Sequence, residues 1–495
     1  MKKIAFDNDK YIKMQSERIL ERISQYDNKL YLEFGGKLFD DSHAARVLPG
    51  FQKDSKLQML LKLKDKAEVV IVINAKDIES NKLRGDSEIS YDNETLRLID
   101  AFNKRGLYVS SVVINQYEKK ATTDKFRQYL DDKGINTYLS YTIEGYPNNV
   151  SYIVSDEGFG KNDYIKTTKP LVVVTAPGPG SGKLSTCMSQ MYHEYKNGVR
   201  AGYAKFETFP VWNLPLKHPV NIAYEAATAN LNDVIMIDPF HLEAYGITTV
   251  NYNRDVEAFN ILQSMFMKIM GSSPYKSPTD MGVNMLGYCI TDEDQVIKSC
   301  KEEVIRRYYK SLCDYKMGKT EQEEVYKLEI LMSQLEIEAT DRKVVNAAKE
   351  KSLEHNTPAF AIELEDGRII KGRRTDLLNA PSACLLNTLK ALGNINDEIP
   401  LISPHILEPI SKLKNNFLNE DSYRLQLDEV LLALTISATT NPLSHQAMLQ
   451  LKEVRELEAH STVMLAANDR NILRKLGINF TETPKYLTND FYLNY

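Results

Sequence analysis

Apolar and polar residues follow each other along the first half of the chain in a pattern that predicts repeated strand–helix units. Short, mainly apolar runs at Glu68–Ile73, Leu107–Asn115 and Leu171–Thr175 are typical of buried strands. Between the first two runs, apolar residues recur every three or four positions, which predicts a helix over residues 93–104. Strands that alternate with helices at this spacing predict an α/β fold with mostly parallel, Rossmann-like or phosphate-loop-like sheets.

The pattern changes after residue 290. Residues 292–355 are rich in Glu, Lys, Tyr and Leu, and a break at Met317-Gly318-Lys319 predicts two long helices that form a hairpin used in subunit contacts. The last 140 residues return to α/β patterning. We therefore expect an α/β region over 1–290, a helical hairpin over 291–355 and a C-terminal α/β domain over 356–495. The first region is either one sheet with a long N-terminal extension or two parts split near residue 165.

A glycine-rich segment, Ala176–Gly182, follows the predicted strand at Leu171–Thr175 and precedes a helix that begins near Lys183. A strand, a glycine-rich turn and a helix N-terminus together form an anion site, because several backbone N–H groups and the helix dipole point to one place. The segment departs from the phosphate-binding loop G-x-x-x-x-G-K-[ST] at two positions. Pro177 replaces the first glycine, and Leu184 replaces the hydroxyl residue that binds Mg²⁺.

The predicted phosphate site consists of loop glycines, a lysine and hydroxyl groups. Its residues are Gly178, Gly180, Ser181, Gly182, Lys183, Ser185 and Thr186. The alternative is a strand-to-helix turn that binds nothing. Three glycines in five residues, followed at once by a lysine at a helix start, favour the phosphate site, with ATP and Mg²⁺ as the candidate cofactors.

Three further residues are candidates for the same chemistry. Asp238 ends the apolar run Asp233–Asp238, and an acid at the tip of a parallel strand is placed to hold Mg²⁺ or water. Asp280 lies in a segment, Ser277–Asn284, that we expect to be an ordered polar loop. Both acids also fit a helix N-cap, which is the alternative. Lys205 follows the loop helix on the next strand.

The stretch from Leu171 to Thr208 weakly resembles the dethiobiotin-synthetase type of phosphate-loop enzyme. That resemblance implies a ligand contact for Lys205, and the alternative is a solvated charge at a strand end. In the C-terminal domain, the predicted hairpin at residues 360–372 and the following helix resemble the core of the cytidine-deaminase-like fold. The metal-binding triplet of that fold corresponds here to Ser382-Ala383-Cys384, without the catalytic Glu, so we expect no zinc and no deamination.

Composition limits the classes of partner. A net charge of −5 over 495 residues provides no basic field, so we expect no nucleic-acid partner. No apolar run approaches the ~20 residues that span a bilayer, so we expect no membrane partner. Five scattered cysteines without a C-x-x-C pair are typical of a reducing cytoplasm and argue against a thiolate metal cluster.

Taken whole, the sequence resembles one bacterial family of proteins of about 500 residues, catalogued as uncharacterised. The strings that carry the resemblance are Glu33–Lys37, Thr175–Lys183, Ser277–Asn284 and Arg373–Asp376. The resemblance implies a cytoplasmic, multidomain α/β protein that forms a homo-oligomer.

Three functions remain open. The first is an enzyme that binds a nucleotide or phosphorylated metabolite at the glycine-rich loop and transfers or hydrolyses a phosphoryl group, with Lys183, Asp238 and Asp280 as catalytic residues. The second is a metal-independent phosphohydrolase that uses the same loop. The third is a non-catalytic ligand-sensing or scaffold oligomer.

Overall fold

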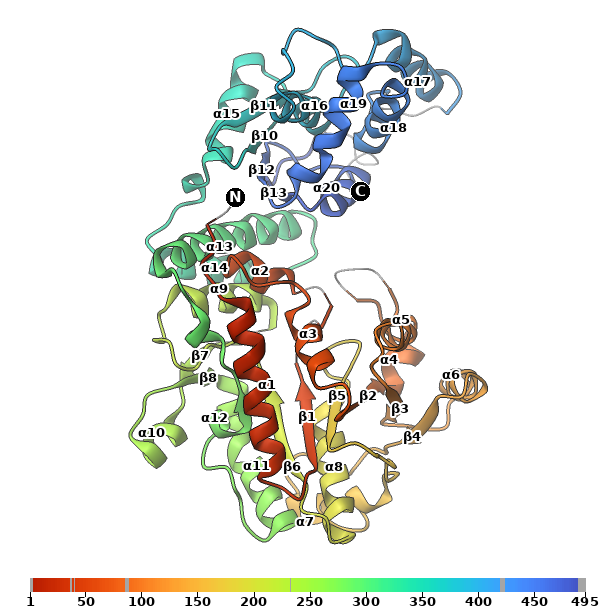
Figure 1. Ribbon diagram of the computed structural model, residues 1–495, viewed down its shortest axis with the longest axis vertical. Helices are drawn as coiled ribbons and strands as arrows, with labels where there is room; N and C mark the ends of the chain where they lie inside the picture. Colours follow the sequence, from red (N-terminus) through yellow and green to blue (C-terminus); the bar gives the residue numbers. More distant parts are fainter. Residues whose placement is uncertain are drawn as a thin grey trace. The chain divides into compact units, whose positions relative to one another are not determined.

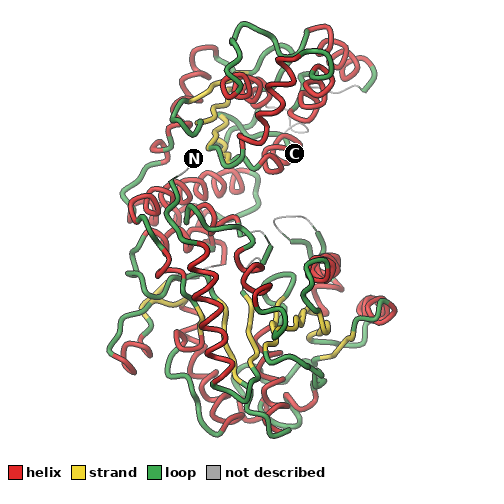
Figure 2. The backbone as a smooth tube through the Cα atoms, in the orientation of Figure 1, coloured by secondary structure: helices red, strands yellow, loops and turns green. Residues whose placement is uncertain are grey.

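The computed structural model describes residues 3–35, 38–39, 41–84, 89–231, 233–418 and 423–487. The chain divides into two compact units. One comprises Lys3–Glu225 and Asn232–Ser299, and the other comprises Met1–Lys2, Ala226–Leu231 and Cys300–Tyr495. In each unit, helices flank a sheet (Figure 2).

The first unit is built on a seven-stranded sheet in the order β4-β3-β2-β5-β1-β6-β9, in which every neighbouring pair is parallel. Its strands are Leu30–Phe34 (β1), Ala67–Asn74 (β2), Val109–Asn115 (β3), Asn136–Leu139 (β4), Leu171–Thr175 (β5), Gly202–Phe206 (β6) and Gly282–Val283 (β9). The central strands are buried along their whole length, as expected for a parallel sheet covered on both faces. The expectation of a mostly parallel α/β sheet is confirmed for this unit.

Helices cover both faces of the sheet (Figure 1). On one face, alternate strand residues such as Val70, Val172 and Tyr203 share a core with α8 (Lys183–Lys196) and α11 (Asn253–Met270). On the other face lie α1 (Asn8–Ser24), α3 (Ser55–Lys62) and α5 (Tyr91–Asn103), of which α1 contacts β6 and β9 and α5 contacts β2 and β3. This arrangement follows from right-handed crossovers, because the chain runs from β1 to β2 in one direction and from β5 to β6 in the other.

Two predictions near the end of this unit are wrong. The run Asp233–Asp238 contains β7 (Ile235–Ile237), which pairs in antiparallel fashion with β8 (Val250–Tyr252) in a separate two-stranded sheet. It is therefore not a strand of the parallel sheet. The segment Ser277–Asn284, expected as a loop, contains a short helix, α12 (Pro278–Met281), and the edge strand β9.

The second unit begins within a helical region. The break at residues 317–319 separates α13 (Glu293–Lys316) from α14 (Gln322–Gln334), as the sequence predicts. The predicted two-helix region contains a third helix, α15 (Lys343–His355), after α14. It packs on the sheet of this unit, because Val344, Ala347 and Ala348 form a small core with Ala361.

The sheet of the second unit has four strands in the order β11-β10-β12-β13. The strands are Ala359–Glu363 (β10), Ile369–Arg373 (β11), Glu458–Ser461 (β12) and Asn479–Glu482 (β13). The predicted hairpin is present as β10 and β11, and the predicted helix after it is α16 (Ala380–Leu392). The resemblance to the cytidine-deaminase-like fold stays a prediction.

Candidate functional site

The carboxyl ends of the seven parallel strands lie at one edge of the large sheet. Strands β2 and β5 are neighbours, but the chain leaves β2 toward β3 and leaves β5 toward β6. In open α/β sheets, ligands bind outside the carboxyl ends of strands at such a switch in direction. The glycine-rich loop follows β5 at this point.

Glycine geometry and local hydrogen bonds shape the loop. Gly180 and Gly182 have φ of 77° and 96°, in the left-handed region that favours glycine. The Ser181 hydroxyl donates to the Gly178 carbonyl over 3.0 Å, and the Asn115 side-chain amide donates to the Ser181 carbonyl over 3.3 Å. The loop therefore rests on the end of β3 as well as on β5 and α8.

Two of the three glycines are required by close neighbours. A Cβ atom at Gly178 would lie 2.2 Å from the Tyr91 hydroxyl oxygen, and a Cβ atom at Gly182 would lie 1.9 Å from the Asn115 amide nitrogen. A Cβ atom at Gly180 would meet nothing within 4 Å. Gly178 and Gly182 thus pack against protein, while Gly180 faces open space.

The loop presents donors that have no protein acceptor. Within the described chain, none of the backbone N–H groups from Gly180 to Ser185 donates a hydrogen bond, and the first to do so is that of Thr186, to Gly182. Lys183 is half-buried and forms no ion pair with a described carboxylate. These donors lie where α8 begins, so the helix dipole adds positive potential.

The predicted hydroxyl donors differ in their surroundings. Thr186 is buried, and its Oγ1 atom has no hydrogen-bond partner among the described residues. Ser185 is half-buried and lies beside the Tyr146 phenol. The pKa of the Tyr146 phenol lies above its ordinary value. Desolvation raises it most and the nearby Glu33 carboxylate adds to this, while the Ser185 hydrogen bond lowers it.

A cluster of charged residues lies at the ends of β1 and β6, next to β5. The Lys205 ammonium contacts Glu207 Oε1 at 2.6 Å and Asp255 Oδ2 at 2.5 Å. Glu33 pairs with Lys205 in the strand register and accepts a hydrogen bond from the Tyr203 hydroxyl over 2.8 Å. Burial alone lowers the pKa of Lys205, but the three carboxylates raise it above its ordinary value. Burial raises the pKa of Glu207, and Lys205 opposes that effect.

The sequence predicts that Lys205 contacts a ligand. In this structure its ammonium group forms ion pairs with two carboxylates. Sequence reasoning missed Glu33 and Asp255 as members of this cluster. The position of Glu33, one residue before the end of β1, was a usable signal because acids at strand ends gather at the same edge of a sheet. Asp255 lies in the first turn of α11, and no local pattern distinguishes it from an ordinary helix-start acid.

Asp238 and Asp280 lie together, but not at the carboxyl edge beside the loop. Asp238 is fully buried as the N-cap of α10 (Pro239–Tyr245), and it accepts hydrogen bonds from the backbone N–H of His241 and from both donors of Thr279. Asp280 accepts hydrogen bonds from the Tyr245 hydroxyl and the backbone N–H of Lys276. Both carboxylates already serve as local acceptors, which agrees with the capping alternative for Asp238.

The residues at the loop do not form a ready magnesium site. Leu184 supplies no oxygen, and Lys205 lies among the carboxylates of the neighbouring cluster. Within the described ranges, no group of three His, Cys, Asp or Glu residues is arranged to hold a metal ion.

In the second unit, burial raises the pKa of the Cys384 thiol to about 12, so this group is a neutral thiol at neutral pH.

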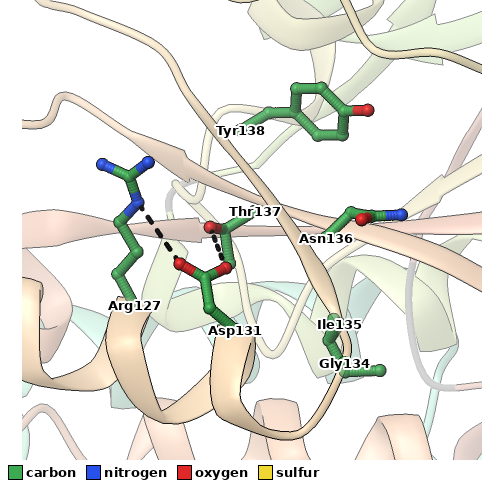
Figure 3. Close-up of a pocket in the computed structure, with 7 residues that line it drawn as sticks. All are labelled: Arg127, Asp131, Gly134, Ile135, Asn136, Thr137 and Tyr138. Atoms are coloured by element: carbon green, nitrogen blue, oxygen red, sulfur yellow. Dashed lines mark hydrogen bonds and ion pairs between the residues drawn. The ribbon is translucent and has the colours of Figure 1, made fainter.

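A cavity of about 370 Å³ lies beside β4, the strand that forms one lateral edge of the large sheet (Figure 3). Three of its polar side chains are paired with each other: Arg127 Nε lies 3.8 Å from Asp131 Oδ2, and the Thr137 hydroxyl donates to Asp131 over 2.7 Å. This mutual pairing leaves less for a ligand to satisfy than the unpaired donors of the glycine-rich loop.

Gly36 and Lys37 of the Glu33–Lys37 string lie outside the described residues. No helix in the described part of the chain is long and apolar enough to cross a membrane.

Comparison with known proteins identifies the family. Residues 4–336 match the domain of unknown function DUF1846, N-terminal, and residues 340–492 match the domain of unknown function DUF1846, C-terminal. A UPF0371 protein of Streptococcus pneumoniae (strain JJA) is 54% identical over 492 residues, which cover 99% of this chain and 100% of the relative. A UPF0371 protein of Streptococcus uberis has the same identity and coverage. The chain therefore belongs to the DUF1846 (UPF0371) family, as its sequence strings predict.

Proposed function

We propose that the glycine-rich loop binds the phosphate group of a nucleotide or phosphorylated metabolite, and that the protein transfers or hydrolyses a phosphoryl group there. The observation that carries this proposal is the set of backbone N–H groups from Gly180 to Ser185 that lack an acceptor, with Lys183 beside them. A phosphate oxygen is the acceptor that such a loop at a helix N-terminus fits best.

The loop amides and Lys183 have a specific role in this proposal. They hold the phosphate and neutralise charge that develops on its oxygens, which is the main contribution a protein makes to phosphoryl transfer. The glycines at 178 and 182 let the loop pack tightly on Tyr91 and Asn115, so the donors are oriented before the ligand arrives.

The neighbouring Lys205 cluster supplies the acid–base groups of the proposal. Glu207 and Asp255 pair with Lys205 and Glu33 lies near it, so the cluster carries more negative than positive charge. A carboxylate of this cluster, rather than Asp238 or Asp280, is our candidate for orienting a water molecule or a substrate hydroxyl. Lys205 restrains Glu207 and Asp255 through its ion pairs.

The metal requirement distinguishes two versions of the proposal. Leu184 in place of a hydroxyl residue favours binding of the phosphate without a protein-bound Mg²⁺, as in a metal-independent phosphohydrolase. If the substrate is ATP, Mg²⁺ reaches the site on the nucleotide.

Thermal shift measurements test the proposal. The panel contains ATP, sugar phosphates and inorganic phosphate, each with and without Mg²⁺. We expect a higher melting temperature with at least one phosphate ligand and loss of this shift in Lys183→Ala, because a charged hydrogen bond contributes about 1.5–3 kcal/mol. Lys196→Ala is the matched control, since Lys196 ends the same helix and is exposed. A protein that no ligand stabilises at millimolar concentration, or an undiminished shift in Lys183→Ala, rules the proposal out.

A further inference from the structure

A second cavity, of about 420 Å³, lies along the edge of the sheet formed by β9. Strands β1 and β6 separate this edge from the glycine-rich loop at β5. Residues of α1, α12 and the segments around residues 212 and 285 line it, and those used below are Arg18, Arg22, Trp212, Asn213, Asp280 and Tyr288.

Arg22 carries a buried charge without a carboxylate partner. It lies on the last turn of α1 and is 9% exposed. One of its Nη groups donates to the backbone carbonyl of Asp280, and its Nε group has no partner among the described residues. The Asp280 carboxylate is directed to other donors. A buried guanidinium is costly unless an anion compensates its charge, so this position points to an anionic ligand.

Other groups in the cavity specify more of the ligand. The Asn213 Oδ1 atom is buried and accepts no hydrogen bond within the described chain, so it can accept one from a ligand. The ring of Trp212 meets that of Tyr288 edge to face, with centroids 6.0 Å apart, and the Trp212 indole N–H is already used by the Asn284 carbonyl. These two rings provide an apolar wall.

We infer that this cavity binds a small organic oxyanion that also carries a hydrogen-bond donor. Its carboxylate or phosphate group pairs with Arg22, its N–H or O–H group donates to Asn213, and its carbon skeleton lies on Trp212. Arg18 also lines the cavity, but its guanidinium is paired with Glu21, so we assign the anion to Arg22. The inference does not depend on the function proposed for the glycine-rich loop.

Trp212 is the only tryptophan of the chain, so its fluorescence reports on this cavity. The probes are inorganic phosphate, acetate and L-serine, each titrated against sodium chloride at equal ionic strength. Phosphate and acetate distinguish the two kinds of oxyanion, and serine adds a donor. We expect a saturable change in fluorescence with at least one probe, and tighter binding of serine than of acetate if the carboxylate is preferred.

Variants locate the response. Arg22→Gln should abolish it, whereas Arg105→Gln should not, because Arg105 also donates to a backbone carbonyl but is exposed in the turn that follows α5. Asn213→Ala should weaken serine at least fivefold and leave acetate unchanged, which tests the site without removing a charge. In the absence of ligand, Arg22→Gln should melt no lower than wild type, because it removes an uncompensated charge.

Any of three outcomes overturns the inference. The first is the absence of a saturable change with all three probes, and the second is an undiminished response in Arg22→Gln. The third is a lower melting temperature of ligand-free Arg22→Gln, which marks Arg22 as a structural residue. Lys183→Ala should leave the fluorescence response intact, so failure here and failure of the loop proposal are separately visible.

Discussion

At the scale of single residues, the three loop glycines have different physical requirements. Gly178 and Gly182 have neighbours within 2.2 Å of the position that a Cβ atom would take, and Gly180 has none. Gly180 and Gly182 both have positive φ. A comparison of alanine variants at positions 180 and 182 therefore separates the cost of backbone strain from the cost of steric overlap.

Replacing Gly182 with alanine should destabilise the protein more than replacing Gly180. Both variants incur the cost of a left-handed alanine, about 1 kcal/mol, and only Gly182→Ala also displaces the Asn115 side chain. We expect urea unfolding to show an additional loss of about 1–3 kcal/mol for Gly182→Ala. Equal losses in the two variants contradict the packing described for the loop.

His460 should make the second unit sensitive to acid. It is 1% exposed, and burial, with a contribution from Arg342, lowers its pKa to about 3. Between pH 6.5 and 3 the unfolded chain binds a proton that the folded chain does not, so the free energy of unfolding falls as pH falls through this range. The contribution is about 3–5 kcal/mol over the full range.

The measurement for His460 is the melting temperature between pH 7.5 and 4, compared between wild type and His460→Asn. The variant should show a weaker loss toward low pH. Asp469 contributes the opposite slope below about pH 6, because burial raises the pKa of its carboxyl to about 6. Since Asp469 is present in both proteins, it does not affect the comparison, and identical pH profiles exclude the assigned role of His460.

At the scale of secondary-structure elements, the hydrophobic pattern predicts what is locally encoded. The runs at residues 68–73 and 171–175 are strands because continuous β-branched residues suit a sheet buried on both faces. The pattern does not reveal β9, since two residues are too few to show a periodicity and this strand is placed by contacts with β6, α1 and α12. It also does not reveal that β7 pairs with β8, because Ile235–Ile237 reads equally well as a parallel strand.

The helix α15 offers a test of element anchoring. The Arg342 side chain, just before this helix, is fully buried and contacts Glu302 on α13 at 3.0 Å and Glu458 on β12 at 2.6 Å. Arg342→Met should lower the free energy of unfolding by about 1.5–3 kcal/mol, because it removes charge-assisted hydrogen bonds to Glu302 and Glu458, of which Glu458 keeps Arg306 as a partner. Arg368→Met, which breaks an exposed pair with Asp366, should change it by at most about 1 kcal/mol. Similar melting temperatures for both variants argue against an anchoring role for Arg342.

At the scale of the whole molecule, each unit has its own sheet and its own hydrophobic core. A fragment that starts at Glu293, where α13 begins, should therefore fold by itself. We expect circular dichroism of residues 293–495 to show native-like helix content and a cooperative thermal transition. A fragment without such a transition shows that the core of this unit is insufficient alone.

The candidate site could be predicted only in part, because its residues come from distant parts of the chain. The loop is contiguous in sequence, so its glycines and Lys183 are recognisable from their spacing. The Lys205 cluster joins residue 33 to residue 255, and the second cavity joins residue 22 to residues 213 and 280. Arg22 reads as a polar position of an amphipathic helix, and its burial beside the Asp280 carbonyl depends on tertiary packing.

The central claim is that backbone amides of the glycine-rich loop bind phosphate. Selective ¹⁵N-glycine labelling gives at most 23 amide signals, and the Gly180 and Gly182 signals can be assigned from the alanine variants. On addition of the phosphate ligand that gives the largest thermal shift, we predict that these two amide protons move downfield and saturate with the same Kd as the thermal response. Movement of glycine signals elsewhere while Gly180 and Gly182 stay unchanged would contradict the account.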